Sequence, residues 1–342
     1  MERLLCRHLE ALVQLEEEAA REYLAAQLQE LGFAVERQPV GFRLENLVAW
    51  RGEPEWFVEA HVDTYLRGPM PVRGWAEGAF SGRGALDVRG QIAALLVALR
   101  ESTTPVELAF VCDEEEGGRG SAALRLRAKK GIVLEPTEFC LGVAQVGGLE
   151  AQVIVEDRPV HAGASAEARR LAERVERFLE ELTALLARAL RVPAAPPPYT
   201  SFEILHVGWQ RWGEDPMVTP WWGALALDVR VPPGNDWERA AEVLEGICRR
   251  HGFRLVLGEA DPPTGLPEDA TVLEEFSQKL RPLGVFPRCW YTAWTDAGNL
   301  WRDGKEAVIW GAGPLWRAHG TQERVRLAEL LHLAEGLRRL LS

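Results

Sequence analysis

The order of strand-like and helical segments constrains the fold of this chain more than any other feature. Outside the middle of the sequence, short apolar runs alternate with segments whose apolar residues recur at helical spacing. The predicted strands are 46–50, 56–60, 106–112, 132–134, 285–290 and 306–310, and the predicted helices are 16–31, 91–100, 121–128, 270–281 and 322–340. This alternation is typical of an α/β protein with a layered sheet.

The middle of the chain follows a different order, with a proline-rich break at 192–198. Its predicted elements are a strand at 149–156, a helix at 166–190, strands at 201–207 and 222–231, a helix at 236–251 and a strand at 253–257. The order βαββαβ is the ferredoxin-like arrangement, which is a self-contained unit. We therefore expect an α/β domain formed by residues 1–146 and 260–342, with a ferredoxin-like domain inserted at 147–259.

Charge and cysteine usage restrict the partners and the compartment. The net charge of −12 argues against a nucleic acid or an anionic membrane as partner, because both require a basic face. The start of the chain lacks the apolar core of a signal peptide, and no apolar run approaches the roughly 20 residues of a membrane helix. The five cysteines are dispersed and form no CxxC pair, which suits a reducing compartment. A cytoplasmic protein is expected.

Two ligand-type motifs occupy the first half of the chain. His61 and Asp63 directly follow a predicted strand, where open α/β sheets build their sites. The aspartate would fix the tautomer of a metal-bound histidine, although a structural or surface histidine is the alternative. Asp87 lies among glycines just before a predicted helix, so it is either a ligand that the backbone approaches closely or the cap of that helix.

Three further motifs also lie at predicted strand ends. The run from Asp113 to Glu116 follows one strand, and its four carboxylates repel one another unless a cation or water surrounds them. A solvated loop is therefore the alternative for this run. Glu135 ends a short strand, and His319 lies in a loop between a strand and the last helix.

Taken together, these motifs predict a dinuclear metal site. Two imidazoles and three carboxylates suit a pair of ions such as Zn²⁺, Co²⁺ or Mn²⁺, with Zn²⁺ expected. A shared carboxylate would hold the ions about 3.5–4 Å apart and generate a bridging hydroxide at neutral pH. A further carboxylate beside the ligands can act as general base.

The motifs resemble those of a family of dinuclear zinc deacylases and peptidases that includes acetylornithine deacetylase, acetyl-lysine deacetylase, succinyl-diaminopimelate desuccinylase and carboxypeptidase G. They are HVDT, SGRGALDVRG, DEEEGGRGS, LEPT and GAGPLWRAHGT, in this order, and the resemblance runs from about residue 12 to 340. It implies a zinc-peptidase-like catalytic domain, and it makes the inserted unit the family's lid and dimerisation domain. A homodimer is therefore expected.

The resemblance also implies a metal-ligand set. His61 and Glu135 would bind one ion, and Glu115 and His319 the other, with Asp87 as the bridge. Asp63 would orient His61, and Glu114 would be the general base. The triple glutamate leaves the register open by one residue, and alignment with the family's DEExG pattern selects Glu114 and Glu115.

In the lid, the resemblance implies that His161 reaches the neighbouring subunit's site and steadies the oxyanion. It implies that Arg230 grips the substrate carboxylate, for which a bidentate guanidinium is suited, although a structural ion pair is the alternative. Met217 stands where relatives often carry an asparagine, and Arg89 replaces a common lysine. The usual Ser-Pro-Ser-Gly turn before the first predicted helix is missing at 12–15.

The leading interpretation is a deacylase of N-acyl amino acids, most similar to the acetyl-lysine and acetylornithine deacetylases of lysine and arginine synthesis. In some relatives the substrate is carried on a small acidic protein, and the charge of −12 makes such a partner less natural here. The alternative enzyme is a dipeptidase or carboxypeptidase. The alternative outside enzymes is a metal-free binding protein on the same fold.

Overall fold

The computed structural model describes residues 1–41, 43–67, 71–164, 170–194, 201–267 and 269–342. The first residues of the helix predicted at 166–190, and most of the proline-rich break, lie outside this part. The chain divides into two compact units. Unit 1 comprises Met1–Val143, Gly265–Tyr291 and Thr295–Ser342, and unit 2 comprises Ala144–Thr264 and Thr292–Trp294.

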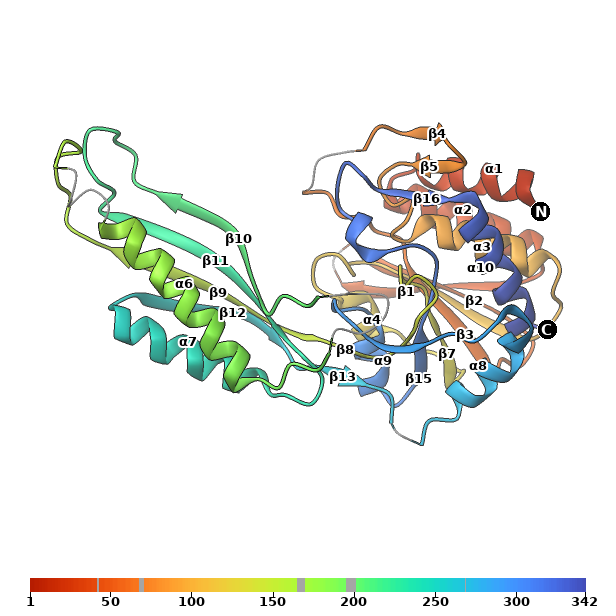
Figure 1. The fold of residues 1–342 in the computed structure, drawn as a ribbon. Helices are drawn as coiled ribbons and strands as arrows, with labels where there is room; N and C mark the ends of the chain where they lie inside the picture. The colour runs from red at the N-terminus through yellow and green to blue at the C-terminus, as the bar shows by residue number, and fades with distance from the viewer. Residues whose placement is uncertain (42, 68–70, 165–169, 195–200, 268) are drawn as a thin grey trace. The chain divides into compact units, whose positions relative to one another are not determined.

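Unit 1 is built on a sheet with the strand order β1-β2-β6-β3-β7-β15-β8-β13, to which β14 is added through β8 (Figure 1). The strands are β1 Ala34–Gly41, β2 Leu44–Arg51, β3 Trp56–His61, β6 Val106–Val111, β7 Lys130–Val133, β8 Leu141–Gln145, β13 Thr264–Gly265, β14 Arg288–Tyr291 and β15 Glu306–Ile309.

Four neighbouring strands at the centre of the sheet, β6, β3, β7 and β15, run parallel to one another. Every residue of β3 and β6 is buried, as expected for parallel strands covered on both faces. Since parallel strands end at the same edge of a sheet, the loops that follow these four strands meet there.

Helices α1 (Glu2–Leu12), α3 (Arg89–Arg100) and α10 (Leu327–Leu340) pack against one another beside the sheet. Helix α3 is buried at all but its last residue, which its apolar sequence RGQIAALLVALR explains. Together with α2 (Glu17–Glu30) and α8 (Val272–Leu280), these helices contribute to one large apolar core. Among the described residues, no helix is both long and apolar enough to cross a membrane.

The remaining elements of unit 1 are short. They are α4 Arg119–Ala123, α9 Ala297–Arg302, the 3₁₀ turns η1 Arg281–Leu283 and η2 Leu315–Arg317, and a separate sheet of β4 Gly74–Ala76, β5 Ala79–Ser81 and β16 Arg324–Arg326.

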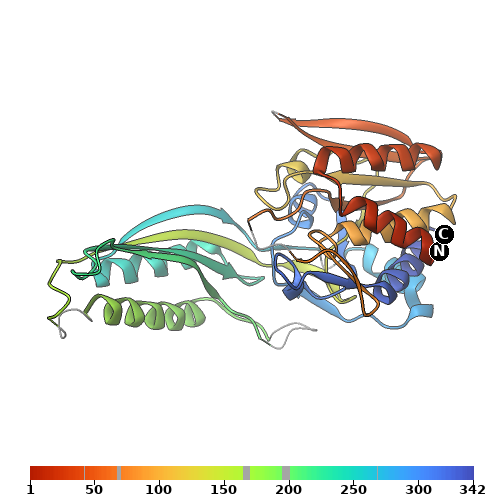
Figure 2. The ribbon, with the colours of Figure 1, turned by 90° about the horizontal axis from the view of Figure 1, so that it is seen from above.

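Unit 2 has the element order βαββαβ, which confirms the ferredoxin-like prediction. Its elements are β9 Gly147–Glu156, α6 Arg170–Ala189, β10 Leu205–Trp212, β11 Trp222–Val231, α7 Trp237–His251 and β12 Arg254–Asp261. The strand order is β10-β11-β9-β12, with every pair antiparallel. Both helices lie on the same face of the sheet (Figure 2) and cover a second apolar core.

Several local predictions were wrong for identifiable reasons. The helix predicted at 121–128 ends at Ala123, because the following backbone N–H groups donate instead to Oε1 of Gln38 and Oε2 of Glu107. The helix predicted at 322–340 begins at Leu327, because β16 pairs with β5 just before it. Helix α1 and strands β1 and β8 were not predicted, and the strand predicted at 201–207 lies further on, in β10.

Candidate active site

The central parallel strands bring the predicted ligands to one edge of the sheet. His61 is the last residue of β3, and Glu114 and Glu115 lie in the loop after β6. Glu135 follows β7, and His319 lies in the loop that connects β15 to β16. Residues far apart in the sequence therefore converge because their strands are parallel neighbours.

The carboxylate of Asp87 lies between the two histidines. Its Oδ1 is 3.1 Å from Nε2 of His61, and its Oδ2 is 3.3 Å from Nε2 of His319. The side chain makes no cap to α3, whose N-cap residue is Val88. A carboxylate with one oxygen toward each histidine has the arrangement required to bridge two cations. The peptide bond that follows Asp87 is cis.

Ligand atoms within 4.8 Å of one another form two groups that share Asp87. One group is His61, Asp87 and Glu135, and the other is Asp87, Glu115 and His319. They contain the five residues that the sequence singled out as ligands.

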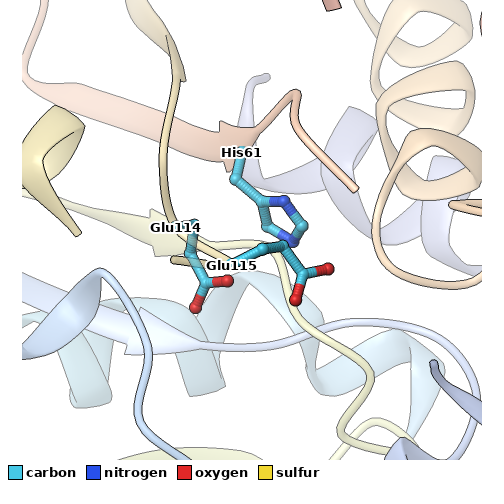
Figure 3. A group of neighbouring side chains, drawn as sticks. All are labelled: His61, Glu114 and Glu115. Atoms are coloured by element: carbon cyan, nitrogen blue, oxygen red, sulfur yellow. The ribbon is translucent and has the colours of Figure 1, made fainter. Parts of the chain in front are cut away.

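A third group of ligand atoms joins His61, Glu114 and Glu115 (Figure 3). The two glutamates are adjacent in the chain, and their carboxyl groups point in different directions below the imidazole of His61. Glu116 is exposed and pairs with Arg67. The structure therefore brings Glu114 and Glu115, and not Glu116, to His61.

Asp63 holds the ends of two strands together. Its Oδ2 accepts a hydrogen bond from the backbone N–H of Glu115 at 3.0 Å. Nδ1 of His61 lies 3.1 Å from the backbone oxygen of Asp63 and 3.6 Å from its Oδ1. Asp63 is thus placed to orient both His61 and Glu115.

The glutamate loop is closed by Asp113. The Asp113 side chain accepts hydrogen bonds from the backbone N–H and the guanidinium of Arg119, and its backbone oxygen accepts from Gly117 and Gly118. These bonds turn the chain tightly after β6. The acidic run is therefore a hydrogen-bonded loop in which only Glu116 is exposed.

Arg89 supports the site from the start of α3, a role that the sequence did not reveal. Its buried guanidinium donates to the backbone oxygen of Val62, between His61 and Asp63, and to the backbone oxygens of Leu12 and Leu15. It thereby fastens the end of β3 to the segment after α1, where the usual turn is missing.

Glu323 is a second residue that sequence reasoning missed. It is buried, and its Oε1 accepts from the backbone N–H groups of Leu86 and Asp87 at 3.2 and 3.5 Å. Its position four residues after His319 was the available signal. Burial raises the pKa of Glu323 to about 8, and the nearby charge of Asp87 adds to this effect.

The site concentrates negative charge. Burial raises the pKa values of Glu114 and Glu135 well above the usual range, and neighbouring carboxylates add to the shift. Burial lowers the pKa of His319, but hydrogen bonds to Asp87 and Glu115 outweigh it and raise the pKa to about 10. Burial likewise opposes charge on His61, and its bonds to Asp63 and Asp87 reverse the shift.

A second layer of carboxyl groups lies behind His61. Glu59, two residues earlier on β3, is fully buried, and burial followed by the neighbouring Asp296 raises its pKa well above the usual range. Asp296 accepts a hydrogen bond from Ser121, and burial raises its pKa to about 7. Neither carboxyl group belongs to a motif that predicted a ligand.

The donor set fits divalent metal ions. Imidazoles combined with carboxylates are the ligands that borderline divalent ions prefer. Packing several carboxylates at one buried edge is unfavourable unless protons or cations offset their repulsion. Divalent cations at the two groups that share Asp87 would do so.

Two other predicted residues lie in unit 2. His161 is exposed, and its Nδ1 accepts a hydrogen bond from the backbone N–H of Gly163 at 3.0 Å. Arg230 donates to Oδ2 of Asp228 at 2.7 Å and to the backbone oxygen of Thr292 at 2.9 Å. The structure thus contains the ion pair that the sequence left open as the alternative for Arg230.

Met217 lies next to the His161 segment. The backbone N–H of Ala162 donates to its carbonyl oxygen at 2.9 Å, and His161 forms a β-bridge with Val218. The Met217 side chain is 61% exposed.

The fold is that of a layered α/β protein, and its clustered imidazoles and carboxylates could hold metal ions. Residues 57–342 match the model of peptidase family M20/M25/M40, so the chain belongs to this family. Family membership makes the protein a hydrolase of amide bonds, as the sequence predicted.

Individual relatives are similar over most of their length. A putative [LysW]-lysine/[LysW]-ornithine hydrolase of Pyrobaculum aerophilum is 29% identical and covers 86% of this chain and 83% of its own. The acetylornithine deacetylase of Myxococcus xanthus is 27% identical, with 91% of this chain and 88% of its own covered. The crystal structure of a tripeptidase from Staphylococcus aureus has the same fold, with a TM-score of 0.76 at 17% identity, over 100% of this chain and 98% of its own.

Proposed function

We propose that the protein is a dinuclear metal hydrolase that removes the acyl group from an N-acyl amino acid, similar to acetylornithine or acetyl-lysine. The observation that carries the proposal is the sharing of Asp87 between two ligand groups. In this proposal unit 1 is the catalytic domain and unit 2 the lid and dimerisation domain, with boundaries near 146 and 260.

The proposed ligand set assigns His61 and Glu135 to one ion, Glu115 and His319 to the other, and Asp87 to both. Zn²⁺ is the proposed metal, and Co²⁺ or Mn²⁺ are alternatives that the same ligands accommodate. Bound ions would supply a Lewis acid for the substrate carbonyl and would lower the pKa of a water molecule.

Glu114 is the proposed general base. Its carboxylate lies in the group with His61 and Glu115. Cations in the site would offset the burial and repulsion that raise its pKa, so that it is ionised when a water molecule binds. Glu114 then accepts a proton from the attacking water and donates it to the leaving amine.

His161 is the proposed oxyanion donor in the site of a partner subunit, which makes the active enzyme a homodimer. Since Gly163 donates to Nδ1, the neutral imidazole of His161 carries its proton on Nε2. An imidazole N–H on an exposed residue suits stabilisation of a developing negative charge.

The substrate class rests on Arg230 and on the sequence relatives. The guanidinium is held by Asp228 and by the backbone of Thr292, and its side chain remains 36% exposed. It can therefore receive a substrate carboxylate without leaving its place on β11. The Pyrobaculum relative is named for a substrate attached to LysW. An amino acid carried on another protein is therefore the second candidate for the substrate.

A cytoplasmic location is also proposed, because the dispersed cysteines of the sequence suit a reducing compartment.

The test is a hydrolysis screen of the zinc-loaded protein against acetyl-ornithine, acetyl-lysine, acetyl-methionine and a leucine dipeptide. We expect the first two substrates to have the highest kcat/KM. A clear preference for the dipeptide would replace the deacylase by a peptidase. Activity that survives complete metal removal would contradict the proposed centre.

A further inference from the structure

Tyr65 contacts two residues of the same proposed metal site. Its ring stacks on the imidazole of His319, with ring centres 4.4 Å apart and planes inclined by 16°. Its backbone N–H donates to Oε1 of Glu115 at 3.0 Å. The other oxygen of Glu115 lies 2.8 Å from Nε2 of His319. One residue therefore fixes both the carboxylate and the imidazole.

His319 needs such support more than His61 does. The His61 side chain is 1% exposed and ends a central strand, whereas the His319 side chain is 40% exposed. His319 also lies in a loop with φ of 62°, in the left-handed region that side-chain-bearing residues seldom adopt. Since few packing contacts restrict an exposed loop side chain, the flat stack on Tyr65 removes much of its rotational freedom.

The segment that follows β3 contacts Glu115 at two points. Oδ2 of Asp63 accepts from the backbone N–H of Glu115, and the backbone N–H of Tyr65 donates to the Glu115 side chain. The described contacts of Tyr65 do not extend to Glu135 or His61. Asp63 therefore contacts ligands of both proposed metal sites, whereas the described contacts of Tyr65 reach the ligands of one site, Glu115 and His319.

We propose that Tyr65 is a positioning residue for the metal ion held by Glu115 and His319, and that the stack on His319 sets the affinity of this ion selectively. This inference rests on the proposed dinuclear function. Residues that orient metal ligands typically change metal affinity by about 10–100-fold. Loss of the ring should therefore weaken one of two binding steps by about 10-fold and leave the other within about 2-fold.

The experiment is a titration of metal-free protein with Co²⁺, followed by calorimetry and by the visible absorption of the bound ion. Tyr65→Leu and Tyr65→Met remove the ring, and Tyr65→Phe keeps it. We expect two binding steps in the unchanged protein and in Tyr65→Phe, and selective weakening of one step in the other two variants. Tyr23→Leu is the matched control. The hydroxyl oxygen of Tyr23 also lies 2.7 Å from a histidine nitrogen, Nδ1 of His8, but Tyr23 makes no described contact with the proposed ligands.

Equal affinities in Tyr65→Leu and the unchanged protein would overturn the inference while leaving the dinuclear function intact. The inference would also be overturned if metal affinity stays unchanged and only the KM for acetyl-ornithine rises, since Tyr65 would then contact the substrate instead. Equal weakening of both steps would also overturn it. Fewer than two binding steps in the unchanged protein would overturn both the inference and the proposed function.

Discussion

Oδ2 of Asp87 lies 3.3 Å from Nε2 of His319, which places a buried carboxylate against an imidazole from a partly exposed loop. The other oxygen of Asp87 faces His61 at 3.1 Å. Because one side chain serves both ligand groups, its loss should affect both metal ions.

Asp87→Ala should therefore abolish tight binding of both divalent ions and reduce turnover to background. Elemental analysis of the zinc-loaded, desalted protein measures the metal content. Asp236→Ala is the control, because Asp236 precedes α7 without a side-chain cap. Two tightly bound ions in Asp87→Ala would show that Asp87 is not the bridge.

Variants of the acidic loop can distinguish the proposed metal ligand, Glu115, from the proposed general base, Glu114. Glu114→Gln should keep both metals and lower kcat by at least about 10²–10⁴-fold, as expected for loss of a general base. Glu115→Gln should lose one metal, because its oxygen lies 2.8 Å from His319. Glu116→Gln is the matched control and should resemble the unchanged enzyme, since Glu116 is exposed. If Glu115→Gln keeps both metals and Glu114→Gln loses one, the two roles are reversed.

His161 offers a test of a shared site. Both His161→Ala and Glu114→Gln should be nearly inactive alone, and mixing them under subunit exchange should restore part of the activity in heterodimers. The recovery is measured as kcat of the mixture against each parent. Sedimentation of the unchanged protein checks the dimer itself. Full activity of His161→Ala would exclude the residue from the mechanism.

Arg230→Lys should raise KM for a substrate with a free carboxylate by about 10-fold or more, with a smaller change in kcat. The single ammonium group of lysine cannot form the two parallel hydrogen bonds that a guanidinium makes to a carboxylate. Lysine would also lose the hydrogen bonds of Arg230 to Asp228 and to the backbone oxygen of Thr292. A substrate with an amidated carboxyl group is the control, because its KM should hardly change. An equal rise for both substrates would assign Arg230 a purely structural role.

Metal-free protein should lose stability as the pH rises. Glu323 and Asp296 have pKa values raised to about 8 and 7 from 4.5 and 3.8, and those of Glu114 and Glu135 are also raised. A carboxyl group whose pKa is higher in the folded protein than in the unfolded chain contributes stability that is fully present below the unfolded pKa. This contribution is lost as the pH rises through the folded pKa. The pKa of Asp87 is lowered in the folded protein, so its contribution to stability is lost only when the pH falls below about 4.

The stabilisation by zinc should therefore grow between about pH 5.5 and pH 8.5, because bound cations also replace protons on the ligands. Thermal unfolding with zinc and with a chelator measures the difference in Tm. A difference that shrinks with rising pH would contradict the ligand set.

The sequence by itself determined the order of the main elements and predicted the residues of the site. Buried apolar runs such as 106–112 and the amphipathic helix of 236–251 carry local periodicity that predicts their type. The residues His61, Asp87, Glu135 and His319 were singled out because each follows or precedes a predicted element. Glu115 was chosen within the acidic run by its resemblance to the family's DEExG pattern. Local pattern failed at 121–128, where acceptors from Gln38 and Glu107 replace the helical bonds.

The tertiary structure alone decided which of these side chains meet, and through which atoms. The parallel order of β6, β3, β7 and β15 brings the strand ends together, and no local pattern encodes this order. Tyr65, Arg89 and Glu323 contact the site through stacking or through backbone groups distant in sequence, so their residue types alone did not indicate these contacts. Local periodicity reports the burial of a segment, whereas contacts between segments depend on how the whole chain packs.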